Sequence, residues 1–230
     1  MLKGDLRKKQ ILETAERLFT AQGYEKTGVQ DILDELQLSK GNFYHHFDSK
    51  DQVLQTICGV HADASAAAAG VFDETDGMNR LNRVLGALIP FSEEGLSFLL
   101  MLLPVFSLPE GKTIRLGFQE ALKKSWLPIV MEALEQASAD QKVFTLYPAE
   151  TASICIDLVN QMWARISDRI IEAEHDGAGL ATPDLLLAEI EPYRVAMENM
   201  LVAPCGSIEL ISLDTLQQVT EKIHDRWKSI

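Results

Sequence analysis

A run of hydrogen-bonding side chains lies between Ser39 and Ser49, close to the amino terminus. If this run is helical, each residue turns about 100° from the last, and Phe43 and Phe47 share one face that must turn toward a core. The opposite side then offers amide, imidazole, phenol and ammonium groups, carried by Lys40, Gly41, Asn42, Tyr44 and His45. Such groups form hydrogen bonds with base edges and phosphates in the major groove of DNA.

The residue types in this run are poor choices for the stability of a short helix. Glycine and aromatic residues have weak helix propensity, so something other than propensity selected Gly41 and its aromatic neighbours. Because glycine has no Cβ, its backbone can come close to a partner. We therefore interpret residues 40–45 as a surface that contacts DNA.

Two short helices are predicted to position this surface. Ile32 and Leu36 recur at helical spacing and predict a helix that begins at a capping box, the Thr-Gly-Val-Gln sequence starting at Thr27. Ser39 is expected to cap the helix that follows. Two helices of about two turns, separated by so few residues, form a helix-turn-helix motif, here from about residue 27 to residue 47.

A further helix is predicted on either side of the motif. Ile11 and Phe19 fall on one face of a first helix, which Gly23 should end. Another helix begins after Ser49, at a second capping box, and continues through the alanine-rich stretch 62–69. The first three helices would form one small unit, with the fourth leading out of it.

The remainder of the chain also has helical periodicity, and we find no strand pattern or internal repeat in it. Proline residues punctuate it: we expect Pro104 to end one helix and Pro128 to kink another. The predicted helices cover residues 78–89, 93–103, 112–138, 148–174, 183–201 and 214–227. The fold class is therefore all-α.

Three parts are predicted along the chain. Residues 1–49 form an N-terminal three-helix DNA-binding domain, and residues 50–72 form a linking helix. Residues 73–230 form a larger C-terminal helical bundle for effector binding and dimerisation. This division follows the change from a neutral to an acidic composition. The net formal charge is −13, yet residues 1–50 hold eight basic and eight acidic side chains, so only this end can readily approach phosphates.

Other classes of site find little support in the sequence. Cys58, Cys155 and Cys205 are scattered and predict neither a disulfide framework nor a metal cluster. His45 and His46 would point about 100° apart on a helix and lack a third ligand, so no metal is expected. Because no catalytic constellation, phosphate loop or dinucleotide fingerprint occurs, we expect neither an enzyme nor a cofactor.

No membrane partner is expected. The amino terminus is charged and helical at once, which predicts no signal peptide. The most apolar run, residues 96–106, is much shorter than the roughly 20 residues that span a bilayer. We therefore expect a cytoplasmic protein that is associated with the nucleoid when it is bound to DNA.

Residues 7–54 resemble the N-terminal domain of the tetracycline-repressor (TetR/AcrR) family. The family's Leu-Phe-x-x-x-Gly-Tyr/Phe segment is matched from Leu18 to Tyr24, and its Thr-x-Val-x-x-Ile segment starts at Thr27. Its Ser-Lys-Gly-x-x-Tyr-x-His-Phe-x-Ser-Lys segment is matched from Ser39 to Lys50. Agreement spread over so many positions makes chance a negligible explanation.

The resemblance implies a division of roles among the polar residues. It implies that phosphates are contacted by Thr27, Tyr44 and Lys50. It implies that the bases are faced by Lys40, Gly41, Asn42 and His45.

Two positions depart from the family pattern. Gln37 stands where members usually have glycine in the turn, and a left-handed backbone there would cost on the order of 1–2 kcal/mol. Gly28 replaces the usual serine or threonine, which removes one potential phosphate contact.

The resemblance also implies a homodimeric, ligand-responsive DNA-binding transcriptional regulator, a repressor released from a palindromic operator by a small-molecule effector. The apolar band of helix 148–174 is too wide for burial on one side, so we expect it to pair with helix 183–201 across a two-fold axis. Two-fold symmetry would place two reading helices about 34–36 Å apart on double-stranded DNA.

Six bulky apolar side chains are candidates for the effector pocket, although such residues more often form bundle core. They are Phe98, Met101, Phe106, Phe118, Trp126 and Trp163. The alternative to a DNA-binding regulator is a helical-bundle enzyme or a small-molecule-binding protein without a DNA function. The polar side of residues 40–45 would then have no explanation.

Overall fold

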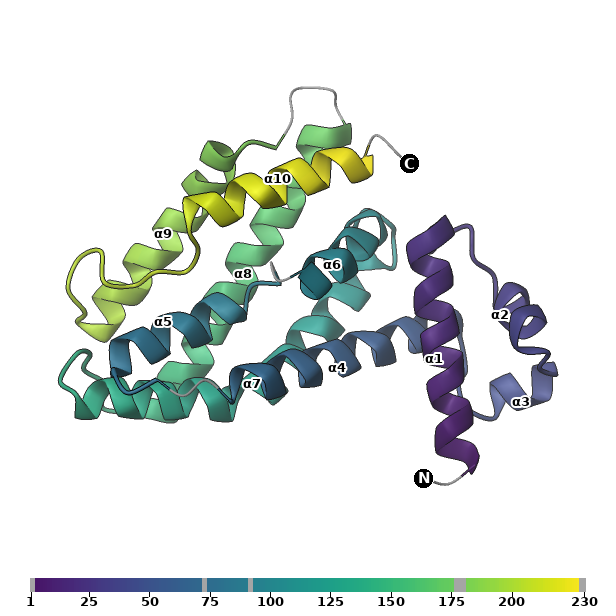
Figure 1. Cartoon of the computed structure of the whole chain (residues 1–230), viewed down its shortest axis with the longest axis horizontal. Helices are drawn as coiled ribbons and strands as arrows, with labels where there is room; N and C mark the ends of the chain where they lie inside the picture. Colours follow the sequence, from purple (N-terminus) through teal and green to yellow (C-terminus); the bar gives the residue numbers. More distant parts are fainter. Residues whose placement is uncertain (1–2, 72–73, 91–92, 176–180, 228–230) are drawn as a thin grey trace. The chain divides into compact units, whose positions relative to one another are not determined.

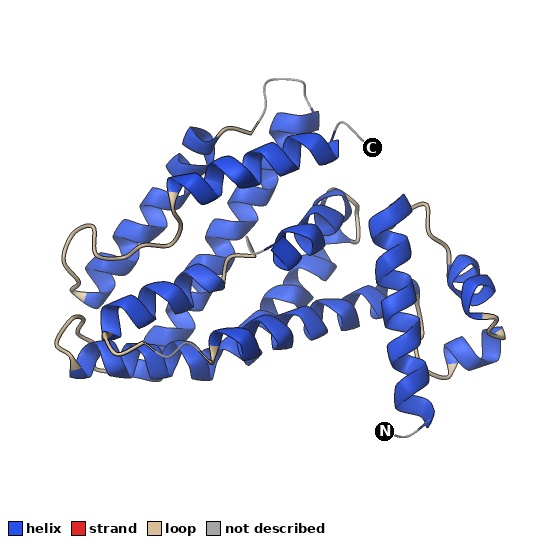
Figure 2. Cartoon of the chain, viewed as in Figure 1, coloured by secondary structure: helices blue, strands red, loops and turns tan. Residues whose placement is uncertain are grey.

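The chain is described here by a computed structural model that covers residues 3–71, 74–90, 93–175 and 181–227. Within these ranges all regular secondary structure is helical (Figure 2). The helices are α1 (Lys3–Gln22), α2 (Val29–Leu36), α3 (Lys40–Tyr44), α4 (Lys50–Ala69), α5 (Gly77–Ala87), α6 (Glu93–Phe106), α7 (Gly111–Ala139), α8 (Pro148–His175), α9 (Pro183–Leu201) and α10 (Leu213–Trp227). The all-α prediction is therefore confirmed.

One predicted helix end is wrong. We expected Pro104 to end its helix, but α6 continues through Pro104 to Phe106. A proline costs a helix one backbone hydrogen bond and crowds the preceding turn, and the burial of its neighbours Leu103 and Val105 offsets this cost. The break comes instead at residues 107–110, and α7 begins at Gly111, where a Cβ atom would lie only 2.2 Å from the carbonyl oxygen of Val105. The tight turn between α6 and α7 therefore requires a glycine.

The chain divides into two compact units. The first unit comprises residues 1–62 and 97–121, and the second comprises residues 63–96 and 122–230. This division describes packing rather than function, so the predicted division into a DNA-binding domain, a linking helix and an effector domain stays a prediction.

The first unit contains the helix-turn-helix motif (Figure 1). Here α2 packs against α1, and α3 follows α2 after a short turn. The side chains of Ile11, Phe19, Ile32, Phe43 and Phe47 are almost completely buried. Burial of such side chains supplies most of the stability of short helices, which are marginal in isolation.

The second unit is a bundle in which α8 packs against α9, and α9 against α10. Thr182 caps the start of α9 by accepting a hydrogen bond from the Leu185 N–H group, and Pro183 occupies its first turn. A connecting segment, residues 202–212, leads from α9 to α10. None of the helices in the described part of the chain is both long and apolar enough to cross a membrane.

Candidate nucleic-acid interface

The start of α2 is capped one residue later than the sequence predicted. Gly28 occupies the N-cap position, and its N–H group donates a 2.7 Å hydrogen bond to the carboxylate of Asp31. Thr27 was the predicted cap, but its buried hydroxyl donates to the carbonyl oxygen of Gly23 at 2.7 Å and accepts from the side chain of Gln22. Thr27 therefore closes the loop after α1 instead of starting α2.

The turn between α2 and α3 has a left-handed backbone at Gln37, the position where the family usually has glycine. Its φ angle is +51° and its ψ angle +45°, a conformation that favours glycine. The turn is held by hydrogen bonds from the N–H groups of Gln37 and Leu38 to the carbonyls at the end of α2. An ion pair between Arg17 and Glu35 also links α1 to α2.

Two phenylalanine side chains anchor α3. Ser39 caps the helix by accepting a 3.3 Å hydrogen bond from the N–H group of Asn42, as predicted. Phe43 and Phe47 are buried, with ring centroids 6.0 Å apart. The regular helix ends at Tyr44, so Phe47 reaches the core from the residues that follow it. The predicted shared face is present, although the helix is only five residues long.

The opposite side of this segment is open to solvent. Tyr44 is 53% exposed, and the other exposed residues are Lys40, Gly41, Asn42 and His45. Gly41 does not have a left-handed backbone, and no atom lies within 4 Å of where its Cβ would be. Neither backbone conformation nor packing within the described structure therefore requires a glycine at this position.

Lys50, the first residue of α4, is anchored to the loop that precedes α2. Its Nζ atom donates hydrogen bonds to the carbonyl oxygens of Tyr24, at 2.8 Å, and Thr27, at 3.0 Å. The ammonium also lies 4.0 Å from the centre of the Tyr24 ring, within the range of a cation–π interaction. Burial lowers the pKa of Lys50 below its ordinary value, against the influence of nearby carboxylates such as that of Asp51.

Tyr24 and Asp51 complete this anchor, and no functional role was predicted for either. The Tyr24 hydroxyl donates a hydrogen bond to the Asp51 carboxylate. Burial and this hydrogen bond raise the pKa of the Tyr24 phenol well above its usual range. In the sequence, the Gly-Tyr pair that ends the segment from Leu18 to Tyr24 was the signal that could have indicated a role for Tyr24.

These positions separate the predicted DNA-contacting residues into two groups. Tyr44 lies with the four residues predicted to face bases, on the exposed side of α3 and the residue after it. Thr27 and Lys50 lie together, joined by a hydrogen bond. An ammonium group has three donors, so Lys50 keeps one beyond the two that it gives to carbonyls.

The amino-terminal domain matches a known family model. Residues 11–57 match the model described as bacterial regulatory proteins, tetR family. Residues 11–57 are thus similar to the amino-terminal domain of the tetR family. The match covers the end of α1, the helix-turn-helix motif and the first turns of α4, which are the elements that position the exposed surface of α3.

The chain is also similar to individual proteins, to some in sequence and to others in fold. The chain is 29% identical over 116 residues to the HTH-type transcriptional regulator YerO of Bacillus subtilis, covering 49% of this chain and 40% of YerO. It is 39% identical over 51 residues to the transcriptional repressor KstR2 of Rhodococcus jostii, covering 22% of this chain and 25% of KstR2. The chain therefore spans less than half the length of these curated relatives.

The similarity of fold extends well beyond the amino-terminal domain. The solved structure of GusR from Salmonella enterica aligns with 88% of this chain and 99% of its own, with a TM-score of 0.53 and 12% sequence identity. At that identity the match concerns the fold alone. A helix-turn-helix domain that matches the tetR model, followed by a larger helical region, is thus the architecture of this chain.

The six side chains predicted for the effector pocket are all buried, but they fall into different units. Phe98 stacks on His61 with ring centroids 3.8 Å apart and packs edge-on against Phe118, within the first unit. Met101 and Phe106 also belong to the first unit. Trp126 and Trp163 belong to the second, where Trp126 donates a 3.2 Å hydrogen bond to Ser65.

None of the six residues lines either of two hollows in the described part of the second unit. One, of about 490 Å³, lies between α9 and the connecting segment. The other, of about 410 Å³, lies between that segment, α4 and α5. Within the described residues, no three His, Cys, Asp or Glu side chains gather closely enough to hold a metal ion.

Proposed function

We propose that the chain is a homodimeric transcriptional repressor that binds a palindromic operator and is released from it by a small-molecule effector. The observation that supports this proposal most is the exposed polar side of residues 40–45. Phe43 and Phe47 are buried on the opposite side of this segment, which lies within the match to the tetR model. The proposal includes a cytoplasmic location, on the nucleoid when the operator is occupied.

The exposed side chains have chemically distinct roles in this proposal. Lys40, Asn42 and His45 present donors and acceptors to base edges, and Gly41 lets the backbone approach the groove closely. The Tyr44 hydroxyl donates a hydrogen bond to a phosphate. Lys50 donates another through its remaining N–H bond. Thr27 contributes to phosphate binding by holding Lys50 in place through its carbonyl.

An uncharged face of α9 supports self-association. One stripe of exposed residues between positions 185 and 199 is uncharged, and its members are Leu185, Ala188, Pro192, Val195, Ala196 and Asn199. At helical spacing they share an arc of about 100°. Two copies of a chain with a net charge of −13 repel one another, so a contact between them needs such a charge-poor face.

The second part of the proposal is that the effector binds in the helical region after the helix-turn-helix. The six predicted pocket residues remain our candidates for contacts with it, through rearrangement of a core in which they are now buried. An effector can release DNA only by binding more tightly to a conformation with weaker operator affinity.

The test of the DNA proposal is to select genomic fragments on the purified chain and measure binding to the fragment recovered. Tyr44→Ala should weaken that binding, because it removes an exposed hydroxyl from the reading surface. Tyr147→Ala is the matched control, since Tyr147 is also exposed, at 66%, but belongs to the second unit. Failure to recover any enriched fragment would favour a small-molecule-binding protein without a DNA function.

The oligomeric state is tested separately. The chain should sediment at about 51 kDa, twice its mass of 25.6 kDa, because two-fold dimers are the commonest oligomers. Val195→Glu places a charge on the exposed face of α9 and should shift the chain toward monomer. Val71→Glu, at a residue that is 79% exposed, should leave it dimeric. A wild-type monomer at micromolar concentration would contradict the proposal.

A further inference from the structure

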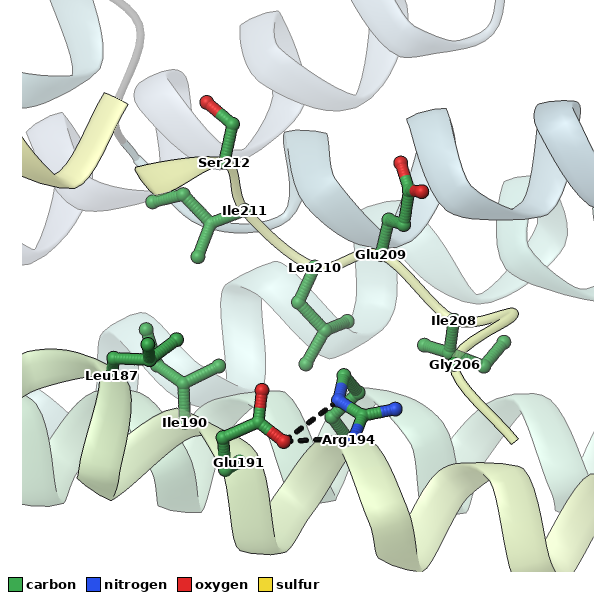
Figure 3. Close-up of a pocket in the computed structure, with 10 residues that line it drawn as sticks. All are labelled: Leu187, Ile190, Glu191, Arg194, Gly206, Ile208, Glu209, Leu210, Ile211 and Ser212. Atoms are coloured by element: carbon green, nitrogen blue, oxygen red, sulfur yellow. Dashed lines mark hydrogen bonds and ion pairs between the residues drawn. The ribbon is translucent and has the colours of Figure 1, made fainter. Parts of the chain in front are cut away.

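The hollow beside α9 has two walls of different kinds (Figure 3). One wall is the helix itself, with Leu187, Ile190, Glu191 and Arg194. The other is the extended part of the connecting segment, residues 206–212. A volume of about 490 Å³ lies within the range of small-molecule sites in proteins.

Apolar side chains line much of this hollow. Leu210 points from the connecting segment toward α9, where Leu187 and Ile190 face it (Figure 3). Leu210 and Ile190 are buried, whereas Leu187 is half-buried and accessible. An alkyl or aryl group placed between these walls would leave water and contact them on two sides.

The charged end of the hollow has more carboxylates than cations. Arg194 donates to the Oε2 atom of Glu191, at 2.9 and 2.8 Å, and to the Oε1 atom of Glu198, at 2.6 Å. Glu198 is buried and also accepts a 3.1 Å hydrogen bond from the Ile208 N–H group. One guanidinium thus faces two carboxylates, and this group of three side chains carries a net charge of −1.

Glu191 is the member of this group that can accept a further partner. Its side chain is 44% exposed, and both bonds from Arg194 go to the same oxygen. Its Oε1 atom has no hydrogen bond within the described residues. A carboxylate oxygen at the edge of an apolar hollow is a suitable acceptor for an ammonium group.

We infer that this hollow binds an amphipathic organic cation, with its ammonium head at Glu191 and its apolar part between Leu187 and Leu210. An organic anion should bind poorly, because two carboxylates would repel it and the guanidinium of Arg194 is already bonded to both of them. The inference goes beyond the proposed function, because it concerns ligand binding alone and holds whether or not the chain binds DNA.

The hollow borders the uncharged face of α9. Leu187, Glu191 and Arg194 follow each other at helical spacing on the side of α9 that meets the connecting segment. Glu191 is three residues after Ala188 and four before Val195, so it is their neighbour on the helix surface. A ligand whose ammonium head binds Glu191 therefore lies at the edge of the proposed contact between copies.

The experiment uses the full chain and three probes of simple chemistry in isothermal titration calorimetry. n-Octylammonium should bind saturably at one site per chain. Methylammonium, which lacks the apolar part, and octanoate, which reverses the charge, should each bind at least about ten-fold more weakly. Octanoate binding as tight as that of octylammonium, or octylammonium binding without saturation, would overturn the inference.

Variants locate the site. Glu191→Gln should weaken octylammonium binding about ten-fold, and Leu187→Lys should abolish it by placing the chain's own ammonium in the hollow. Glu221→Gln, at an exposed residue of α10, is the matched control and should bind like the wild type. Circular dichroism verifies that each variant is folded. Undiminished binding by folded Glu191→Gln and Leu187→Lys proteins would place octylammonium elsewhere and refute the assignment.

Discussion

The Lys50 ammonium donates a 3.0 Å hydrogen bond to the backbone carbonyl of Thr27, so two residues that were each predicted to contact phosphates contact each other. Lys50 begins α4, and Thr27 ends the loop that precedes α2. This bond joins the two ends of the helix-turn-helix motif and gives Lys50 a structural role in addition to its proposed role on DNA.

Replacing Lys50 should therefore affect both folding and DNA binding. In Lys50→Met the apolar stem is kept but the bonds to the two carbonyls are lost, and we expect a loss of about 1 kcal/mol in stability, because this partly exposed group is screened by water. Operator affinity should fall. The slope of the logarithm of the binding constant against the logarithm of the salt concentration should become less steep by about one unit per subunit. Denaturant titration and binding at several salt concentrations measure the two effects. Tyr44→Ala should lower affinity alone; equal destabilisation by both variants would contradict this assignment.

Gly41 offers a cleaner separation of folding from recognition. Because a Cβ at this position meets nothing, Gly41→Ala should be neutral or stabilise the free protein by about 0.5–1 kcal/mol, as alanine favours a helix. The same methyl group would stand between the backbone and the base edges, so operator affinity should fall about ten-fold or more. Thermal denaturation and a binding titration of one protein sample measure both. Unchanged affinity would show that the backbone does not approach the groove at this residue.

Gln37 should be a site of straightforward stabilisation. Its left-handed φ of +51° is unfavourable for a residue with a Cβ, so Gln37→Gly should stabilise the protein by about 1 kcal/mol. Gln218→Gly, the same change at an exposed position inside α10, should destabilise it by a similar amount. Denaturant midpoints measure both changes. Destabilisation by Gln37→Gly would mean that the glutamine side chain contributes more than its backbone costs.

Glu198 should make stability depend on acidity. Burial alone would raise its pKa, but hydrogen bonds from Ile208 and Arg194 prevail, and the pKa lies below its ordinary value of 4.5. A carboxyl group whose pKa is lowered by folding stabilises the folded state at pH values above its pKa in the unfolded chain. This stabilisation is lost as the pH falls through its pKa in the folded protein. Stability should therefore decline as the pH falls below about 4.5, and the decline should be shallower in Glu198→Gln. Chemical denaturation at a series of pH values tests this, with Glu221→Gln as the control.

Most of the fold follows from patterns that are local in the sequence. The helix starts at Ser39 and Thr182 are marked by side chains that cap in place, and the left-handed turn at Gln37 follows from the family pattern. The start of α2 was misplaced because two overlapping capping patterns compete there. The carboxylate of Asp31 is charged and bonds to Gly28, while the Thr27 hydroxyl finds a carbonyl in its own loop.

The exposed part of the candidate site was also predictable, because a helical wheel that buries Phe43 and Phe47 exposes the polar side chains on the opposite side of residues 40–45. The position of the Lys50 ammonium was not, since a long flexible side chain can reach many carbonyls and the sequence does not select one. The hollow beside α9 was missed for another reason. It depends on how the connecting segment folds back on the helix, and bulky apolar residues, on which the predicted pocket was based, do not indicate that fold.

The contacts of Tyr24 restrict how the start of α4 can move. Its carbonyl and its ring both hold Lys50, and its hydroxyl holds Asp51, so three separate interactions fasten the first turn of α4 to the loop before α2. A rotation of the first turn of α4 would therefore displace the loop before α2 together with it.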